Sequence, residues 1–166
     1  MAINRGKAFE TKFKEDWAKA FPKTFEYRIP DQMSGYKQQS SNPCDFICFT
    51  GRLLFLIEAK VHKGNTFPFS NLRQYDKLIQ YKDSLNTYPG VVLWFIEHDT
   101  VIWCSIKDIE RMKLDGKKSI NIKMLHPKSD EVDYNLYEIP SKKKRVFMDS
   151  DYSKLEEFVE NGKCNS

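Results

Sequence analysis

Two acidic residues and a lysine stand close together along two short apolar runs of the chain. Asp45 opens the first run, and Glu58 and Lys60 close the second, with a glycine-containing turn between the runs. Two carboxylates can bind Mg²⁺ or Mn²⁺ through oxygen and leave positions for water and a phosphate oxygen. The metal lowers the pKa of bound water, and a fixed lysine orients that water or stabilises a pentacovalent transition state. The group therefore suits phosphodiester hydrolysis.

A β-hairpin would bring the three side chains to one face. The two apolar runs flank a Thr-Gly pair, a pattern typical of strands joined by a tight turn. With a two-residue turn, Asp45 lies opposite Leu56, and the alternation of side chains puts Glu58 and Lys60 on the same face as Asp45. The two carboxylates are then diagonal neighbours, roughly 7–8 Å apart. A four-residue loop keeps this parity, whereas a loop of odd length breaks it.

The alternative is that Glu58 and Lys60 are solvent-facing charges at the end of an apolar strand. The spacing of an aspartate, a glutamate and a lysine two residues later is by itself a weak pattern. Position favours the functional interpretation, because the hairpin is rigid, leads out of the core and lies next to a polar loop. Under that interpretation, loss of Asp45 or Glu58 abolishes cleavage, and Lys60→Ala lowers the rate more than the DNA affinity.

Hydrophobic periodicity and turn residues outline the elements that must position this group. An apolar stripe of period four predicts a first helix over residues 6–21. A polar stretch over residues 30–43 predicts an exposed loop or short stalk. Ser105 and Ser153 open capping boxes that predict two short helices. The remaining predictions are strands at 24–29, 45–49, 53–59, 91–96 and 101–104, a helix at 70–86, and turns at 50–51 and 89–90.

The order of these elements predicts one α/β domain over residues 1–166, with a central mixed β-sheet flanked by helices. Composition excludes collagen-like and disordered classes, because 40% of the residues are apolar and there are only 7 glycines and 7 prolines. No apolar run approaches the ~20 residues of a membrane-spanning helix, and the N-terminus does not resemble a signal peptide. We therefore expect a cytoplasmic protein without a membrane partner, whose four cysteines are buried, reduced thiols.

The charge is mildly basic and unevenly distributed. The net charge is +4, and the pI of about 8.8 is too low to indicate nucleic-acid binding by itself. Two interpretations of the basic clusters stay open: a solvated face, or phosphate contacts that give DNA affinity without sequence information. Tyr36, in the polar loop, is a candidate for stacking on an opened base. The clusters are Lys117-Lys118 and Lys142-Lys143-Lys144-Arg145.

Asp45 followed by Glu58-Ala59-Lys60 resembles the active-site pattern of the PD-(D/E)xK nuclease superfamily, whose core is a helix, three strands, a helix and a further strand. More specifically, the chain resembles the RecU-type Holliday junction resolvases of Gram-positive bacteria and their phages. The resemblance runs from residue 4 to about residue 120, and residues 121–166 form a looser tail. The other segments that carry it are Asn4-Arg5-Gly6 with Glu10, Phe67-Pro68-Phe69, Asn71-Leu72-Arg73-Gln74, Gly90 to Asp108, and Gly116-Lys117-Lys118-Ser119-Ile120.

The resemblance implies a restriction-endonuclease-like domain with a Mg²⁺ or Mn²⁺ site. It implies metal ligands at Asp45, Glu58, the Ala59 carbonyl and Glu10, with Lys60 as the catalytic lysine and Gln74 as a supporting catalytic residue. Family members are homodimers that cut symmetric strands of a four-way junction, and they also modulate a strand-exchange recombinase. The residues expected to bind DNA are Arg5, Tyr36, Lys37, Lys117, Lys118, Lys142, Lys143, Lys144 and Arg145.

We therefore expect a structure-selective, metal-dependent endonuclease that resolves four-way (Holliday) junctions by paired symmetric nicks. One alternative is a duplex endonuclease of the same superfamily, which would need to read base edges in a groove. The other is a DNA-binding modulator of a recombinase without significant hydrolysis. Metal-dependent cleavage separates the modulator from the nucleases, and substrate shape separates the two nucleases.

Overall fold

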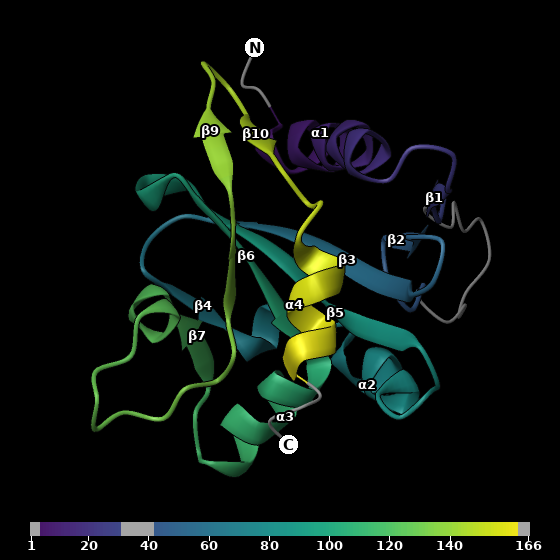
Figure 1. Cartoon of the computed structure of the whole chain (residues 1–166). Helices are drawn as coiled ribbons and strands as arrows, with labels where there is room; N and C mark the ends of the chain where they lie inside the picture. The colour runs from purple at the N-terminus through teal and green to yellow at the C-terminus, as the bar shows by residue number, and fades with distance from the viewer. Residues whose placement is uncertain (1–3, 31–41, 163–166) are drawn as a thin grey trace, which may run out of the picture.

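A six-stranded mixed sheet runs through the middle of the molecule (Figure 1). The computed structural model describes residues 4–30 and 42–162. The sheet has the order β1-β2-β3-β5-β6-β8, in which β3 and β5 are parallel and the other neighbours are antiparallel. The predicted central mixed β-sheet is thereby confirmed. Its strands are β1 (Glu26–Arg28), β2 (Phe46–Phe49), β3 (Leu54–His62), β5 (Thr87–Phe95), β6 (Thr100–Ser105) and β8 (Tyr137–Ile139).

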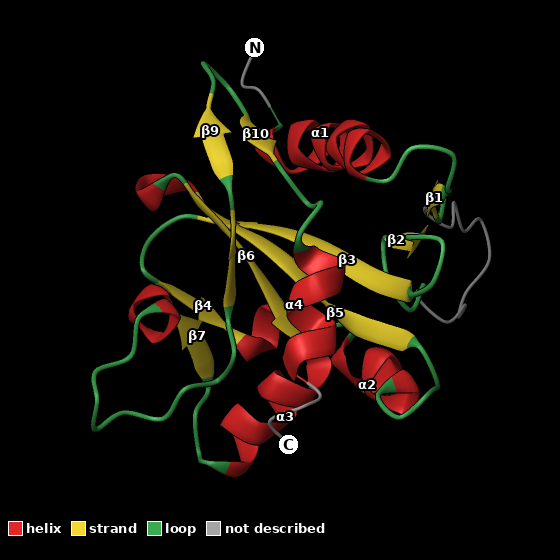
Figure 2. Ribbon diagram, in the orientation of Figure 1, coloured by secondary structure: helices red, strands yellow, loops and turns green. Residues whose placement is uncertain are grey.

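Helices and two short ribbons cover the two faces of this sheet (Figure 2). One face carries α1 (Arg5–Ala20), α4 (Leu155–Gly162) and the ribbon of β9 (Ser141–Lys143) and β10 (Met148–Ser150). The other face carries α2 (Tyr75–Leu78), α3 (Ile106–Leu114) and the ribbon of β4 (Thr66–Pro68) and β7 (Ser119–Asn121). Among the described residues, no helix is long and apolar enough to cross a membrane. The 3-10 turns are η1 (Phe69–Asn71), η2 (Ile79–Tyr81), η3 (Ile96–His98) and η4 (Ile122–Leu125).

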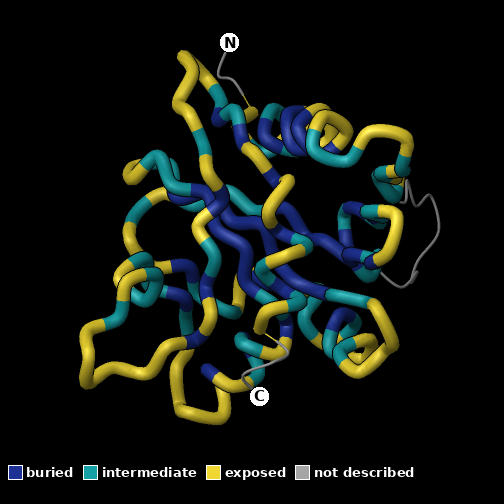
Figure 3. Tube along the Cα trace, viewed as in Figure 1, coloured by how far each residue is buried: buried dark blue, intermediate teal, exposed yellow. Residues whose placement is uncertain are grey.

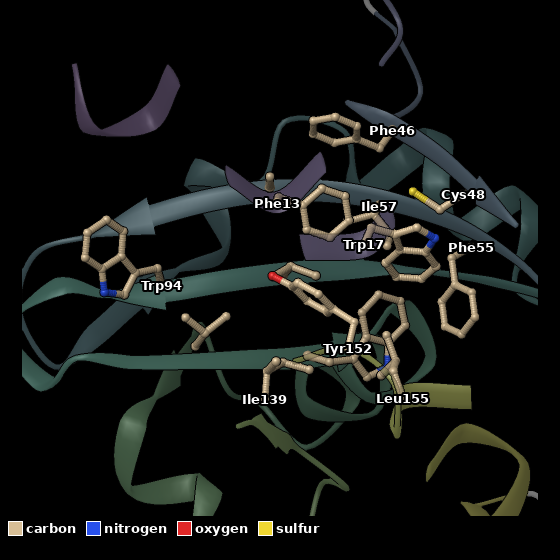
Figure 4. Packing of buried hydrophobic residues seen from close by; sticks show 14 of the residues in the cluster. Phe13, Trp17, Phe46, Cys48, Phe55, Ile57, Trp94, Ile139, Tyr152 and Leu155 are labelled. Atoms are coloured by element: carbon tan, nitrogen blue, oxygen red, sulfur yellow. The ribbon is translucent and has the colours of Figure 1, made fainter. Parts of the chain in front are cut away.

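The first face is packed with aromatic side chains from α1 and the C-terminal segment (Figure 4). Phe9, Phe13 and Trp17 form the buried stripe of α1, which confirms the helix predicted from their spacing. The Phe13 ring lies 4.8 Å from that of Phe46 and 5.1 Å, edge-on, from that of Tyr152. Removing one such ring typically lowers stability by about 3–5 kcal/mol. This packing fixes α1 against the strand that begins at the candidate site.

The second face buries aliphatic residues of the central strands under α3, and the strands are the most buried part of the chain (Figure 3). Ser105 caps α3 by accepting a hydrogen bond from the Asp108 N–H at 3.1 Å, as the capping box predicts. Trp94 and Trp103 lie in strands and are buried, as core residues rather than stacking platforms. Cys44, Cys48 and Cys104 are buried and unbridged.

The hairpin of β2 and β3 differs from its prediction in loop length. Phe49 pairs with Leu54, so the loop has four residues, closed by a hydrogen bond from Thr50 N–H to Leu53 O at 3.0 Å. The predicted two-residue turn is wrong because Gly51, at φ +102°, is an inner residue of this longer loop. An even loop length preserves the predicted parity, and the register shift moves Asp45 from opposite Leu56 toward Glu58.

Two other predictions of local structure are wrong. Residues 70–86 form only η1, α2 and η2, because the apolar stripe ends early: Leu78 is buried but Leu85 is 92% exposed. Pro89 and Gly90 lie inside β5 rather than in a turn. A Cβ at Gly90 would meet Trp103 at 2.4 Å, so the glycine allows close approach of β6. Pro89 precedes the first β5–β6 pair, and its missing N–H therefore removes no bond to β6.

The C-terminal segment is part of the core, although the family resemblance is looser over residues 121–166, where the pattern predicts only the short helix after Ser153. β8 joins the edge of the central sheet beside β6. Met148, Tyr152 and Leu155 are buried in the aromatic cluster under α1. The sequence signal is weak there because these contacts come from short strands and single side chains rather than from a long periodic helix.

Candidate active site

The candidate active site lies at the start of β2 and in the middle of β3. Extending the β2–β3 register by one residue places Asp45 directly opposite Glu58. The Asp45 backbone is held on both sides, because Asp45 O accepts from Ile29 N–H at 2.8 Å and Asp45 N–H donates to Ile57 O at 3.1 Å. Glu58 and Lys60 are two residues apart on β3 and share a face. The structure therefore brings the three predicted residues together.

Glu58 is a fully buried carboxylate, with 0% of the residue exposed. No described residue donates a hydrogen bond of regular geometry to either of its oxygens. Lys60 Nζ lies 2.6 Å from Oε1 as an ion pair. Burial, followed by the negative charge of Asp45, raises the pKa of Glu58 to about 7 even though Lys60 opposes the shift. A buried carboxylate in this condition is unfavourable by itself and is stabilised by a cation.

Asp45 is oriented by the backbone of β3. Ala59 N–H donates to Asp45 Oδ2 at 2.9 Å. The N–H and C=O of one strand residue point to the same side of the strand. The Ala59 carbonyl therefore faces the β2 side of β3, beyond the last β2–β3 pair. Burial raises the pKa of Asp45, and the bond from Ala59 opposes that shift. Two carboxylates and a main-chain carbonyl thus face one region.

These donors fit a hard divalent cation. Mg²⁺ takes oxygen ligands only, and protein sites commonly offer one or two carboxylates and leave the other positions to water and phosphate. Asp45, Glu58 and the Ala59 carbonyl supply such a set, and the unsatisfied oxygens of Glu58 supply the need for positive charge. Across residues 4–30 and 42–162, no group of three or more His, Cys, Asp or Glu side chains forms a metal cage.

Glu10 lies at the margin of the site, in an ion pair. Its Oε2 accepts from Nε and Nη2 of Arg28, both at 2.8 Å. Its charge still contributes to the raised pKa of Asp45 and of Glu58. The sequence interpretation missed Arg28, although a cation in a short strand just before the catalytic hairpin was visible. The structure thus places Glu10 near the carboxylate pair but engaged with Arg28.

Gln74 immediately precedes α2 and has a buried, unsatisfied side-chain oxygen. Its Oε1 accepts no hydrogen bond from any described residue. Its backbone carbonyl accepts from Lys77 and Leu78 and so starts the short helix. No hydrogen bond or ion pair within the described residues joins Gln74 to Asp45, Glu58 or Lys60. Its supporting role therefore remains a prediction.

Cys44 is a buried thiol immediately before Asp45. Burial, followed by the charges of Glu58 and Asp45, raises the pKa of Cys44 to about 12. The thiol donates to Phe46 O at 3.3 Å. Burial and the neighbouring carboxylates thus favour the protonated thiol of Cys44.

The residues predicted to bind DNA fall into separate exposed groups. Arg5 begins α1, and the lysine pair at 117–118 lies in the loop before β7. The third group lies on β9 and in the turn toward β10. Tyr36 and Lys37 lie outside the described residues. The third group consists of Lys142, Lys143, Lys144 and Arg145.

The arrangement of the chain is similar to that of a known junction-cutting enzyme. The structure matches Hjc, a Holliday junction resolvase from the archaeal hyperthermophile Archaeoglobus fulgidus, with a TM-score of 0.52 and 20% sequence identity. The match covers 70% of this chain and 88% of that chain. No protein-family model and no curated protein matches the sequence. At this identity the similarity concerns the fold, and it confirms the predicted restriction-endonuclease-like architecture.

Proposed function

We propose that this chain is a Mg²⁺-dependent endonuclease that resolves four-way DNA junctions by paired symmetric nicks. The observation that carries the proposal is Glu58, a fully buried carboxylate with unsatisfied oxygens, placed beside Asp45 and Lys60. The fold shared with a Holliday junction resolvase supports the substrate class. The sequence resemblance supports the narrower assignment to the RecU type, of bacterial or phage origin, acting in the cytoplasm.

Asp45, Glu58 and the Ala59 carbonyl would hold the metal. When bound, Mg²⁺ or Mn²⁺ neutralises charge on the phosphate and lowers the pKa of water. Ala59 N–H fixes the Asp45 carboxylate by holding Oδ2. Arg28 holds Glu10 beside the pair, so that Glu10 adds negative potential and a further oxygen at the margin.

The ammonium group of Lys60 has two roles in this proposal. In the structure its Nζ partly neutralises Glu58 at 2.6 Å, and 27% of its side chain is exposed. Turned toward substrate, the same group orients the attacking water and counters the negative charge that builds on the phosphate. Its main effect is therefore on the rate of cleavage rather than on DNA affinity.

Resolution needs two nicks in strands related by symmetry. A homodimer with one site per subunit supplies that symmetry, and we propose a homodimer as the acting species. Branched DNA is the proposed substrate. A strand-exchange recombinase is a further proposed partner, on the sequence resemblance.

The test is cleavage of a labelled, mobile four-way junction beside a linear duplex of the same sequence, with and without Mg²⁺. Glu58→Ala removes the buried carboxylate. Glu138→Ala is the matched control, because Glu138 also lies on a strand of the central sheet but is exposed. We expect paired symmetric nicks on the junction alone, lost in Glu58→Ala and retained in Glu138→Ala.

Each other outcome selects a different function. Equal cutting of both substrates favours a duplex endonuclease of the same fold. Tight binding without cutting, under Mg²⁺ or Mn²⁺, leaves a DNA-binding modulator of recombination and contradicts the enzyme. Cutting that persists in Glu58→Ala contradicts the proposed site even if the protein is a nuclease.

A further inference from the structure

A buried ionic cluster joins α1 to β10. Lys12 and Asp16 are 8% and 2% exposed, and the two side chains form an ion pair one helical turn apart. Lys12 Nζ also donates to Asp149 Oδ1 at 2.6 Å, and Asp16 Oδ2 accepts from Ser150 N–H at 2.8 Å. Each charge therefore has partners on both elements. The hydrogen bonds from Lys12 to the Asp16 and Asp149 carboxylates offset the cost of burying its ammonium group.

The opposite flank of α1 holds the margin of the active site. Glu10 and Lys12 are two residues apart, which on an α-helix is a rotation of about 200°. Glu10 reaches Arg28 on β1, whereas Lys12 reaches Asp149 on β10. Because the buried stripe of α1 fixes the helix on the core, α1 sets the position of β10 relative to the catalytic face.

β10 is the second strand of a basic hairpin that projects beside α1 (Figure 1). Its tip is exposed (Figure 3) and tightly turned, with Lys144 N–H donating to Phe147 O at 2.9 Å. Lys143 pairs with Asp99 at 2.9 Å, which holds the hairpin from the side. Lys142 and Arg145 have no ion-pair partner among the described residues. The hairpin thus presents exposed cations and is held by two contacts, one from Asp149 to Lys12 and one from Lys143 to Asp99.

Asp149 is the residue that could neutralise this surface. It lies opposite Lys142 in the β9–β10 register. Its carboxylate instead binds Lys12, with Lys19 at 3.8 Å. The cluster therefore occupies the one carboxylate directly across the ribbon from Lys142 and leaves the Lys142 ammonium available.

A buried ionic cluster is by itself weak evidence for stability. Apolar residues of similar volume often stabilise a core as well as a buried ion pair does, whereas an ion pair fixes one relative position of two elements. A fixed position is useful when an exposed surface must meet a polyanion of regular geometry, such as a DNA backbone.

We propose that the β9–β10 hairpin is a rigid arm that binds the phosphate backbone of duplex DNA outside the cleavage site, and that Lys12, Asp16 and Asp149 are positioning residues that hold it. The inference rests on the proposed function in taking DNA as the ligand. Lys142 and Arg145 make the phosphate contacts. The ionic cluster acts through them and does not touch the DNA.

The sign of one substitution separates positioning from simple charge. Asp149→Asn removes a negative charge near a basic tip, so electrostatics alone predicts tighter binding of DNA. If Asp149 positions the arm, the same substitution weakens binding, by about fivefold. Asp83→Asn is the matched control, because it removes an exposed carboxylate that pairs with Lys107 far from the hairpin in sequence.

The experiment measures binding of a labelled duplex arm by fluorescence anisotropy, in EDTA so that no cleavage occurs, over a range of salt concentrations. We expect weaker binding for Asp149→Asn, recovery in Asp149→Glu, and no loss in Asp83→Asn. The double variant Lys142→Ala/Arg145→Ala should lose affinity and flatten the salt dependence by about one phosphate contact per residue. Adding Asp149→Asn to it should have no further effect.

Unchanged or tighter DNA binding by Asp149→Asn overturns the proposed arm. An unchanged salt dependence of binding by Lys142→Ala/Arg145→Ala overturns it as well, and that variant leaves the buried cluster intact. Absence of DNA binding by the wild-type protein overturns both the arm and the proposed function. Binding that follows the expected pattern without any cleavage under Mg²⁺ contradicts only the proposed nuclease.

Discussion

Two lysine–carboxylate groups in this molecule have carboxylates that are buried to a similar degree but differ in their hydrogen-bond partners. Asp16 has Lys12 at one oxygen and Ser150 N–H at the other. Glu58 has an ion pair with Lys60 at one oxygen and no regular hydrogen bond at either. Each group is a carboxylate beside a lysine. Within the described residues, only the Asp16 carboxylate has a regular hydrogen bond in addition to its ion pair.

The difference separates a structural group from a binding site. A buried polar group that has all its hydrogen-bond partners rigidifies the fold. Removing one partner leaves the others buried without a hydrogen bond, which is unfavourable. A buried carboxylate without a regular hydrogen bond, as at Glu58, marks a candidate site for a ligand from outside the protein. Hydrogen bonding rather than burial therefore distinguishes the two carboxylates. Substitutions of Asp16 and Glu58 should have opposite effects on stability.

The largest expected effect is on catalysis at the incomplete group. Lys60→Met should lower kcat for junction cleavage by about 10²–10³-fold while DNA affinity changes by less than about twofold, because the ammonium acts on the reacting phosphate. Single-turnover cleavage and anisotropy measure the two quantities. Lys107→Met, which removes an exposed lysine from a surface pair, should leave both unchanged. A Lys60→Met protein that cleaves normally would place catalysis elsewhere.

The next effect is on stability at the complete group. Asp16→Asn should lower the free energy of unfolding by about 3 kcal/mol, because it leaves Lys12 buried with reduced charge compensation. Urea denaturation measures the change. Asp83→Asn should change stability by less than about 0.5 kcal/mol, since its ion pair is exposed. Equal stability of the two variants would mean that the buried cluster contributes nothing to the fold.

Glu58→Gln should act in the opposite direction from Asp16→Asn. Burial and the negative charge of Asp45 raise the pKa of Glu58 to about 7 from its ordinary value of 4.5, so the folded state binds this proton more tightly than the unfolded state. Stability therefore falls as pH rises from about 4.5 to about 7. Without metal, Glu58→Gln should exceed wild type by about 2–3 kcal/mol at pH 8 and equal it near pH 4. Denaturation at both pH values tests this, and a variant less stable at pH 8 contradicts it.

The smallest effect is the response to metal. Under the proposed function a cation binds Glu58, so Mg²⁺ at about ten times its dissociation constant should stabilise the wild-type protein by about 1.4 kcal/mol. The effect should diminish below pH 7, where Glu58 binds a proton instead. Thermal melts with and without Mg²⁺ measure it. Glu58→Gln should show little of this stabilisation, and an equal response would place the cation at another site.

The shared face of the three candidate site residues was predictable because it depends on the parity of the hairpin loop. Side chains alternate with period two, so any even loop between the strands puts Asp45, Glu58 and Lys60 on one face. The loop length itself was not predictable from a Thr-Gly pair, which fits an inner position of a four-residue loop as well as a two-residue turn. The fold class followed from the order of the elements, which local errors did not change.

The structural cluster was not predictable, because its partners are far apart in the chain. The spacing of Lys12 and Asp16 permits an ion pair on a helix, but such pairs are usually exposed. Asp149, 137 residues away, shows no signal in the sequence. Gly90 misled for a different reason: a glycine after a proline is typical of a turn, and only the position of Trp103 shows that close packing requires it.

The third oxygen of the candidate site comes from a peptide group, and this has a consequence for how variation at the site is interpreted. Ala59 is buried in the aromatic cluster, so its methyl group faces the core while its N–H donates to Asp45 and its C=O points to the same side of the strand. The core around residue 59 limits the size of its side chain, whereas the main-chain groups it contributes are present in every amino acid except proline, which lacks the N–H. An alanine scan passes over this position without a change, and sequence variation there reports on packing rather than on chemistry.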